Sequence, residues 1–314
     1  MVFDLGLSAT ALALLGIVFG AIIGSFLNVV IIRLPIMLKA EWTHEAKLFL
    51  GIESNEEKSI NIVSPRSQCP DCGTPIKALH NIPLLSYCFL RGRCGHCGSL
   101  ISIQYPIIEL LTGFVTAYFF TVYGISEKTL LSLLFSYCLI VLATIDMREQ
   151  ILPDQITLPL IWIGLGVSLF FGYWATPEES ILGAALGYLS LWSVMYLFKL
   201  ITGKEGMGYG DFKLNAAIGA WLGWQMIPTV ILISSFAGAV LGLLAIAFYG
   251  HDSRNPFAFG PFKRLLSYND KTDACTRAFV VPFASLFGSI LIGRPSLTFT
   301  KIFAKSNPSA IVVA

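Results

Sequence analysis

The stretch Gly208-Tyr209-Gly210-Asp211 places a carboxylic acid directly before an apolar segment that runs to about Trp224. A charged side chain beside hydrocarbon costs roughly 2.5 to 3.5 kcal/mol on membrane-insertion scales, so such a residue is usually paired or functional. A second acid, Asp146, closes the apolar run 130–145. If both segments end at the same face of a bilayer, the two acids lie at the same depth.

The composition of the chain indicates a polytopic membrane protein. Its 314 residues are 55% hydrophobic and 13% charged, with a mean hydropathy of +0.73. A soluble domain of this length cannot bury so much apolar surface. The net charge of +2 is too small to indicate a nucleic-acid partner. The first apolar run, 8–32, has no basic region before it and is too long for a signal peptide, so it predicts a spanning helix.

The apolar runs predict an all-α fold with about eight transmembrane helices. A helix needs about 20 apolar residues to cross a bilayer, or about 17 if its surroundings adapt. By this measure the crossings are 8–33, 105–123, 129–146, 155–174, 179–200, 211–225, 228–249 and 278–293. The segment 39–62, between the first two crossings, is of mixed polarity and predicts an interfacial amphipathic helix followed by a polar loop.

The distribution of basic residues predicts the orientation of these crossings. Lys and Arg concentrate in segments 35–104 and 251–277, while the loops on the other side carry almost no positive charge. Because short cytoplasmic loops are the basic ones, both segments are expected in the cytoplasm and both termini outside. Asp146 and Asp211 then lie at the cytoplasmic membrane boundary.

Four of the seven cysteines form two hairpin motifs, Cys69-Pro-Asp-Cys72 and Cys94-Gly-His-Cys97, separated by 21 residues. This spacing is typical of a ribbon-type zinc site, and four thiolates leave no open position for catalysis. We therefore predict a structural Zn2+ that stabilises a cytoplasmic insertion after the first helix. The alternative is a set of reduced cysteines without metal.

The two acids allow acid–base chemistry. Two carboxyls held close together cannot both ionise easily, so one draws a proton from water while the other donates to a substrate carbonyl, as in aspartic proteases. The alternative is a pair of helix-end acids that face headgroups and neighbouring Arg148 or Lys213. Asp154 competes for the first role, although its position after Pro153 is also that of a helix N-cap.

Four further residues are candidates for substrate contact or structural support. Gly208 and Gly210 permit a tight turn or a close backbone approach before Asp211, although a flexible linker explains them almost as well. Arg33 and Glu109, near the inner ends of the first two crossings, are expected to pair with each other, or Arg33 to reach headgroups, rather than to contact substrate.

Taken together, these residues resemble a known family, the bifunctional type IV prepilin peptidase / N-methyltransferases. The resemblance covers residues 10 to 293. It rests on Gly24-Ser-Phe-Leu-Asn-Val-Val-Ile-Ile-Arg-Leu-Pro35, Asn81-Ile-Pro-Leu-Leu-Ser86 and Arg91-Gly-Arg-Cys94 between the cysteine hairpins, Ile101-Ser-Ile-Gln-Tyr-Pro-Ile-Ile-Glu109, Ile145-Asp146 with Leu152-Pro-Asp154, and Gly208-Tyr-Gly-Asp211.

The resemblance implies a GxGD-type aspartic protease of the bacterial inner membrane. It would remove the basic leader of type IV prepilins and of the pseudopilins of type II secretion, and would methylate the new N-terminus from S-adenosylmethionine. By motif, it implies that Asp146 and Asp211 are catalytic and that Cys69, Cys72, Cys94 and Cys97 hold zinc. No residue of an S-adenosylmethionine site, and no oligomeric state, follows from it.

This interpretation divides the chain into a first transmembrane helix (1–34), a cytoplasmic domain (35–104), a seven-helix membrane protease domain (105–293) and a tail (294–314). The family pattern departs near the end, where Phe259-Gly-Pro-Phe262 and Val281-Pro-Phe-Ala-Ser285 both resemble one expected motif. Two other functions remain open. A proton-coupled transporter would place its acids at the midplane of the bilayer, and a zinc-bearing scaffold of a secretion apparatus would not need them at all.

Overall fold

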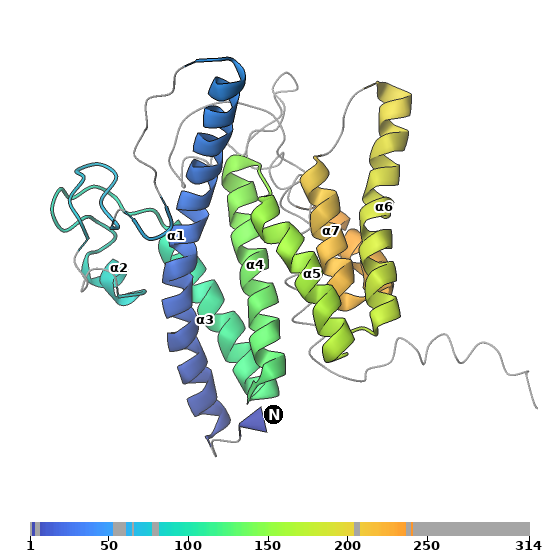
Figure 1. Ribbon diagram of the computed structural model, residues 1–314. Helices are drawn as coiled ribbons and strands as arrows, with labels where there is room; N and C mark the ends of the chain where they lie inside the picture. The colour runs from blue at the N-terminus through green and yellow to red at the C-terminus, as the bar shows by residue number, and fades with distance from the viewer. Residues whose placement is uncertain are drawn as a thin grey trace, which may run out of the picture.

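The computed structural model describes residues 2–3, 7–52, 61–64, 66–76, 82–203, 208–236 and 240, and these are mostly helical (Figure 1). The elements are β1 (Val2–Phe3), α1 (Ala9–Phe49), α2 (Leu85–Phe89), α3 (Gln104–Tyr123), β2 (Ile125–Ser126), α4 (Glu127–Glu149), α5 (Asp154–Phe170), α6 (Pro177–Thr202), α7 (Tyr209–Leu222) and a short 3-10 helix, Trp224–Met226. β1 and β2 pair antiparallel.

Four of the described helices, α1, α3, α4 and α6, are long and apolar enough to cross a membrane. α5 and Trp224–Phe236 are apolar but shorter. The segment predicted as the sixth crossing is α7, which has only 14 residues. The predicted crossing 278–293, the two competing motifs after residue 250 and the tail 294–314 lie outside the described residues, and 228–249 is described only in part.

The first helix is longer than predicted. α1 runs without a break from Ala9 to Phe49 and has Pro35 in its interior. The helix predicted from residue 39 is present up to Phe49 but is a continuation of α1, so the predicted domain boundary between residues 34 and 35 lies within one helix. Its 41 residues span about 60 Å at 1.5 Å per residue, twice the hydrocarbon thickness of about 30 Å, so one end extends beyond the bilayer.

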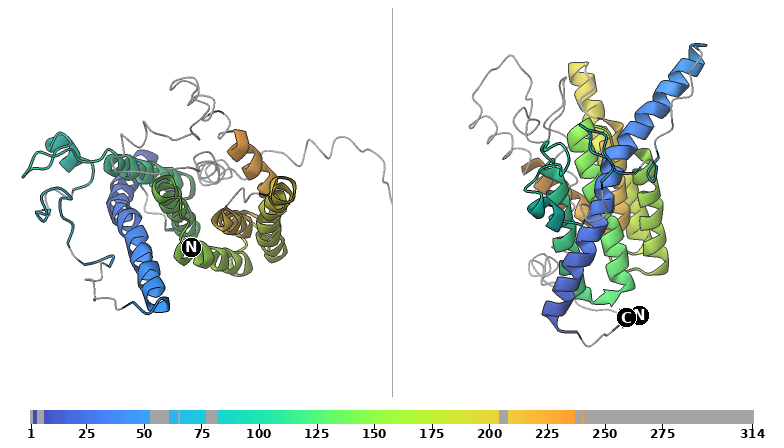
Figure 2. Two further views of the ribbon diagram at one scale, coloured as in Figure 1. Left: turned by 90° about the horizontal axis from the view of Figure 1, so that it is seen from above. Right: turned by 90° about the vertical axis from the view of Figure 1, so that its left-hand side faces the viewer.

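The helices stand in a row, with α1 and α3 at one end, α4 and α5 in the middle, and α7 and α6 at the other end (Figures 1 and 2). Glycines bring the outer pairs close together. A Cβ added to Gly20 of α1 would lie 2.4 Å from the carbonyl oxygen of Thr112 on α3. In the same way, a Cβ on Gly183 of α6 would lie 2.2 Å from the carbonyl oxygen of Gly219 on α7. Such small-residue contacts are typical of helices that pack within a bilayer.

The core of the row lies along α4 and α7. Leu139, Leu142 and Ile145 of α4 and Leu214 and Ile218 of α7 are completely buried. Large apolar side chains such as Trp162 and Phe170 are instead exposed on the outer surface of α5. A buried seam with an apolar exterior is the pattern expected of a bundle that is solvated by lipid.

Candidate active site and metal centre

Asp146 lies in the last turn of α4, and its side chain is only 5% exposed. Gln150 ends the helix in the left-handed conformation, and its backbone N–H donates to the carbonyl oxygen of Asp146 at 2.9 Å. The Oδ2 atom of Asp146 is buried and has no hydrogen-bond partner among the described residues. A buried carboxyl oxygen without a partner is costly, and such groups are concentrated at functional sites.

Asp211 lies in the first turn of α7 and is partly buried, with Gly208 as the N-cap residue. The positive end of the helix dipole favours a carboxylate at this position. The carboxyl groups of Asp146 and Asp211 are close enough for the charge of one to act on the other. The structure therefore places the two predicted acids within electrostatic range of each other.

The pairing follows from how α4 and α7 run past each other. The rings of Phe135 on α4 and Trp221 on α7 stack with centroids 4.8 Å apart. Asp146 lies 11 residues after Phe135 and Asp211 lies 10 residues before Trp221, so at 1.5 Å per residue both acids lie about 15 Å from this contact, on the same side of it. The ring stack thus marks a register of α4 and α7 in which the two acids lie at one level.

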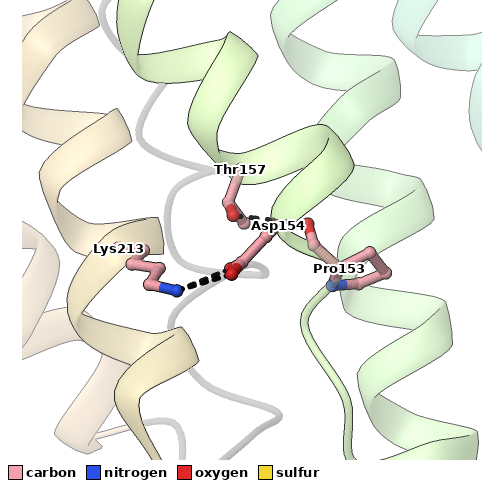
Figure 3. Close-up of polar contacts among 4 residues, drawn as sticks. All are labelled: Pro153, Asp154, Thr157 and Lys213. Carbon is pink, nitrogen blue, oxygen red and sulfur yellow. Dashed lines mark hydrogen bonds and ion pairs between the residues drawn. The ribbon is translucent and has the colours of Figure 1, made fainter. Parts of the chain in front are cut away.

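Asp154 has a different partner. Both of its carboxylate oxygens lie 2.7 Å from Nζ of Lys213, in the second turn of α7 (Figure 3). It is the first residue of α5 and not the predicted N-cap, which is Pro153. The N-cap interpretation is wrong because the carboxylate turns toward a cation on another helix. The hydroxyl of Thr157 donates to the carbonyl oxygen of Pro153, which also accepts the backbone N–H groups of Ile156 and Thr157.

The two glycines before Asp211 have different surroundings. A Cβ on Gly210 would lie 2.8 Å from Cβ of Leu152, so this residue must be small for α7 to approach the α4–α5 connection. Among the described residues, no atom lies within 4 Å of a Cβ built on Gly208. Close packing therefore explains Gly210 and does not explain Gly208.

Arg33 and Glu109 use hydrogen-bond partners other than those predicted. The guanidinium of Arg33 donates to the carbonyl oxygens of Asn61 and Ile62 at 3.0 and 3.1 Å. Glu109 is buried, and its Oε2 accepts a hydrogen bond from the backbone N–H of Leu84 at 2.8 Å. Both residues thus contact segments of the insertion between α1 and α3.

A buried polar chain that sequence reasoning missed reaches the end of α4. Arg148 donates to Oε1 of Gln104 at 3.0 Å, and Gln104 in turn donates to Oδ1 of Asn28 at 3.5 Å. Nδ2 of Asn28 donates to the carbonyl oxygen of Tyr105 at 3.2 Å. The signal available in the sequence was an amide or a cation at the inner end of each of three predicted crossings.

The four predicted zinc ligands form one cluster. The sulfur atoms of Cys69, Cys72, Cys94 and Cys97 all lie within 4.8 Å of one another. Each pair is presented by a tight hairpin in which a glycine with positive φ, Gly73 (+67°) or Gly98 (+75°), follows the second cysteine.

The electrostatics of the cluster favour the thiolate at Cys69 and Cys97, whose pKa values are lowered by hydrogen bonds. At Cys94, by contrast, backbone hydrogen bonds are outweighed by burial and by the neighbouring thiols of Cys97 and Cys69, which raise its pKa. A hydrogen bond from the backbone N–H of Cys72 lowers the pKa of the Cys69 thiol to about 6, and partial burial opposes this shift. Because the thiolate is the form that binds zinc, a four-sulfur cluster of this kind fits Zn2+. Cys88 is exposed and lies outside the cluster.

Comparison with known proteins gives two adjacent family matches. Residues 18–123 match the bacterial Peptidase A24 N-terminal domain, and residues 133–243 match the type IV leader peptidase family. No solved structure gives a significant match.

Curated relatives match across most of the chain. A prepilin leader peptidase/N-methyltransferase of Aeromonas salmonicida is 48% identical over 247 residues, which are 78% of this chain and 84% of that protein. Proteins of the same name from Pseudomonas aeruginosa and Burkholderia pseudomallei are 45% and 43% identical over 253 and 275 residues. These alignments cover 80% and 87% of this chain, and 87% of each relative.

Proposed function

The chain belongs to the type IV leader peptidase family, and from this membership we propose that it is an inner-membrane enzyme that cleaves the leader from prepilins and pseudopilins and methylates the new N-terminus. The four long apolar helices support the membrane location. The proteolytic half is supported by the positions of Asp146, in the last turn of α4, and Asp211, in the first turn of α7, which lie within electrostatic range of each other.

In the proposed mechanism the two acids share the work of hydrolysis. The ionised carboxyl takes a proton from a water molecule, whose oxygen attacks the scissile carbonyl carbon, while the protonated carboxyl donates to the carbonyl oxygen. The C–N bond then breaks, and the leaving amine receives a proton from the acid that accepted one. No covalent intermediate with the enzyme is formed. The orphaned Oδ2 of Asp146 is free of hydrogen bonds from described residues and so is available to a water or a substrate group.

The site is proposed to lie at the cytoplasmic face, as the basic loops predict. A prepilin with its charged leader in the cytoplasm and its apolar helix in the membrane would then present the scissile bond at the level of the two acids. A helix-end position also argues against a proton-coupled transporter, whose acids belong near the middle of the bilayer.

The test replaces each acid singly, as Asp146→Asn and Asp211→Asn, and follows leader removal from a prepilin in membranes. Asn keeps the size of the side chain but cannot exchange the proton, so cleavage should be lost in both variants while the protein stays folded. Glu127→Gln is the matched control, since it neutralises an acid of α4 at the opposite end of that helix, and it should cleave normally. Normal cleavage by both Asp variants would remove the assignment.

Methyl transfer is proposed from the relatives, and S-adenosylmethionine is the co-substrate that it implies. When bound, this molecule would supply an electrophilic methyl group to the amine that cleavage exposes. Purified protein given a prepilin and labelled S-adenosylmethionine should release the leader and label the pilin. With pilin that has already been cut, the two Asp→Asn variants should still transfer label, because the dyad acts only on the peptide bond.

The cysteine cluster is proposed to hold one structural Zn2+. Its four thiolates would complete a tetrahedron and leave no place for a reacting water. The metal would stabilise two hairpins that have little apolar core of their own.

A further inference from the structure

The helix α2 carries large apolar side chains away from the helical bundle. Leu85 is 56% exposed and Phe89 is 84% exposed, and Leu100, in the second cysteine hairpin, is 80% exposed. Three such residues in one small unit are unusual for a surface that faces water, where contiguous apolar patches mark sites of interaction.

A hydrogen bond fixes the depth of α2 relative to the membrane helices. The backbone N–H of Leu84, directly before α2, donates to Oε2 of Glu109 at 2.8 Å. Glu109 lies five residues after the start of α3 at Gln104, or about 7.5 Å along the helix axis. Its backbone packs against α1, since a Cβ on Gly24 would lie 2.8 Å from Cα of Glu109. The bond therefore ties α2 to the side of a membrane-spanning helix and not to a region beyond its end.

The overall arrangement agrees with this depth. α2 lies beside α1 and α3, at the level of the first turns of α3 and below the free end of α1 (Figures 1 and 2). In this part of α3, Ile107 and Leu110 are also exposed. If α2 were surrounded by water, that water would lie at the same depth as these exposed apolar side chains of α3. This depth therefore favours contact of α2 with lipid.

The charges next to α2 fit the membrane surface. Arg91 and Arg93 follow α2 directly, and both are exposed. Apolar side chains flanked by arginine are the combination found in segments that lie in the headgroup region, where the apolar groups enter the acyl boundary and the cations meet anionic phosphates.

We propose that the unit formed by Leu85, Phe89, Arg91 and Arg93, here called the α2 anchor, is a lipid-binding surface. Leu85 and Phe89 enter the boundary between headgroups and acyl chains, and the two arginines bind anionic phospholipid headgroups. The anchor holds the cysteine cluster against the bilayer, beside the first turns of α3. The proposal rests on α1 and α3 spanning the membrane and does not depend on the roles of Asp146 and Asp211.

The first test uses the full chain in nanodiscs of phosphatidylethanolamine and phosphatidylglycerol, with the photo-crosslinking residue p-benzoylphenylalanine in place of Phe89. The matched control carries the same group in place of Asp71, an exposed residue of the first cysteine hairpin. After irradiation, mass spectrometry should find phospholipid adducts at position 89 and only background at position 71. Lipid adducts at 89 no more frequent than at 71, or adducts at 89 only to added prepilin or to a second copy of the chain, would overturn the proposal.

The second test leaves the apolar residues unchanged. Amide hydrogen exchange of residues 84–93 is measured in nanodiscs with and without phosphatidylglycerol, for the natural chain and for Arg91→Gln/Arg93→Gln. The natural chain should exchange more slowly when the anionic lipid is present, and the double variant should lose that difference while it keeps its bound zinc. Equal exchange in the two lipids for the natural chain would contradict the role given to the arginines.

Discussion

The contact between Gly183 and Gly219 tests how closely α7 packs against α6. Backbone meets backbone at this point, so no side chain can change its rotamer to make room. A Cβ added to Gly219 would lie 2.1 Å from the carbonyl oxygen of Gly183 and 2.4 Å from its carbonyl carbon. Gly219→Ala must therefore push α7 away from α6. Since α7 carries Asp211 in its first turn, the displacement reaches the proposed dyad.

The change in the free energy of unfolding of Gly219→Ala combines a gain in helix propensity with the cost of overpacking. Replacing Gly by Ala in a helix stabilises it by up to about 1 kcal/mol where space is free. Gly166 of α5 is such a position, since no atom of the described residues lies within 4 Å of the Cβ that would be added. The helix gain is common to both substitutions, whereas overpacking the tight contact costs about 1 to 3 kcal/mol at Gly219 alone, so Gly166→Ala and Gly219→Ala should differ by about 1 to 3 kcal/mol.

Thermal unfolding of both variants in one detergent measures this difference. At roughly 2 °C per kcal/mol for a chain of this size, Gly219→Ala should unfold at least about 2 °C below Gly166→Ala. Prepilin cleavage should fall in Gly219→Ala and stay normal in Gly166→Ala. Equal unfolding temperatures would show that α6 and α7 are not in contact at this glycine, and the reasoning would fail.

Three further predictions concern single contacts. Cys72→Ser should lose the bound zinc, measured by elemental analysis of the purified protein, whereas Cys88→Ser should retain it because Cys88 lies outside the cluster. Lys213→Met and Asp154→Asn should show a coupling of only about 0.2 to 1 kcal/mol in a double-mutant cycle of thermal stability, because the ion pair is partly solvated. The side chains of Lys213 and Asp154 are 28% and 54% exposed. A coupling well above this range would mean that the membrane shields the pair. Trp221→Phe should destabilise the protein by about 0.5 to 1.5 kcal/mol because it removes the hydrogen bond from the indole N–H to the carbonyl oxygen of Leu160, while Trp162→Phe, on the exposed surface of α5, should be nearly neutral.

The features that were predictable from sequence are those set by local spacing and by hydropathy. Two cysteine pairs with a glycine after each second cysteine allow few arrangements other than facing hairpins, and the cluster is present. The level of Asp146 and Asp211 was predictable because each acid marks an end of an apolar run, and helices of similar rise place such ends together. These inferences need no knowledge of which helix packs against which.

The features that were not predictable depend on contacts between distant segments. Proline usually marks the end of a helix, yet α1 continues through Pro35 to Phe49. Asp154 carried an ordinary N-cap signal, and only the position of Lys213, 59 residues away, turns its carboxylate elsewhere. Glu109 had a plausible cation in Arg33, but its carboxylate instead accepts a backbone N–H from the insertion.

The last turn of α4 explains why residues far from the dyad should affect it. Within four residues this turn faces three neighbours, because successive side chains on a helix are rotated by about 100°. Asp146 faces α7, Arg148 is bonded to Gln104 of α3, and Glu149 is paired with Lys39 on the extended part of α1. A shift of α3 is therefore transmitted to the helix end that carries Asp146 through the part-buried bond between Arg148 and Gln104, and α1 adds the weaker, solvated ion pair of Lys39 with Glu149. If the two acids act as proposed, the geometry of cleavage depends on the α1–α3 pair even though neither of those helices supplies a catalytic group, and the long α1 is then part of the scaffold that aligns the dyad.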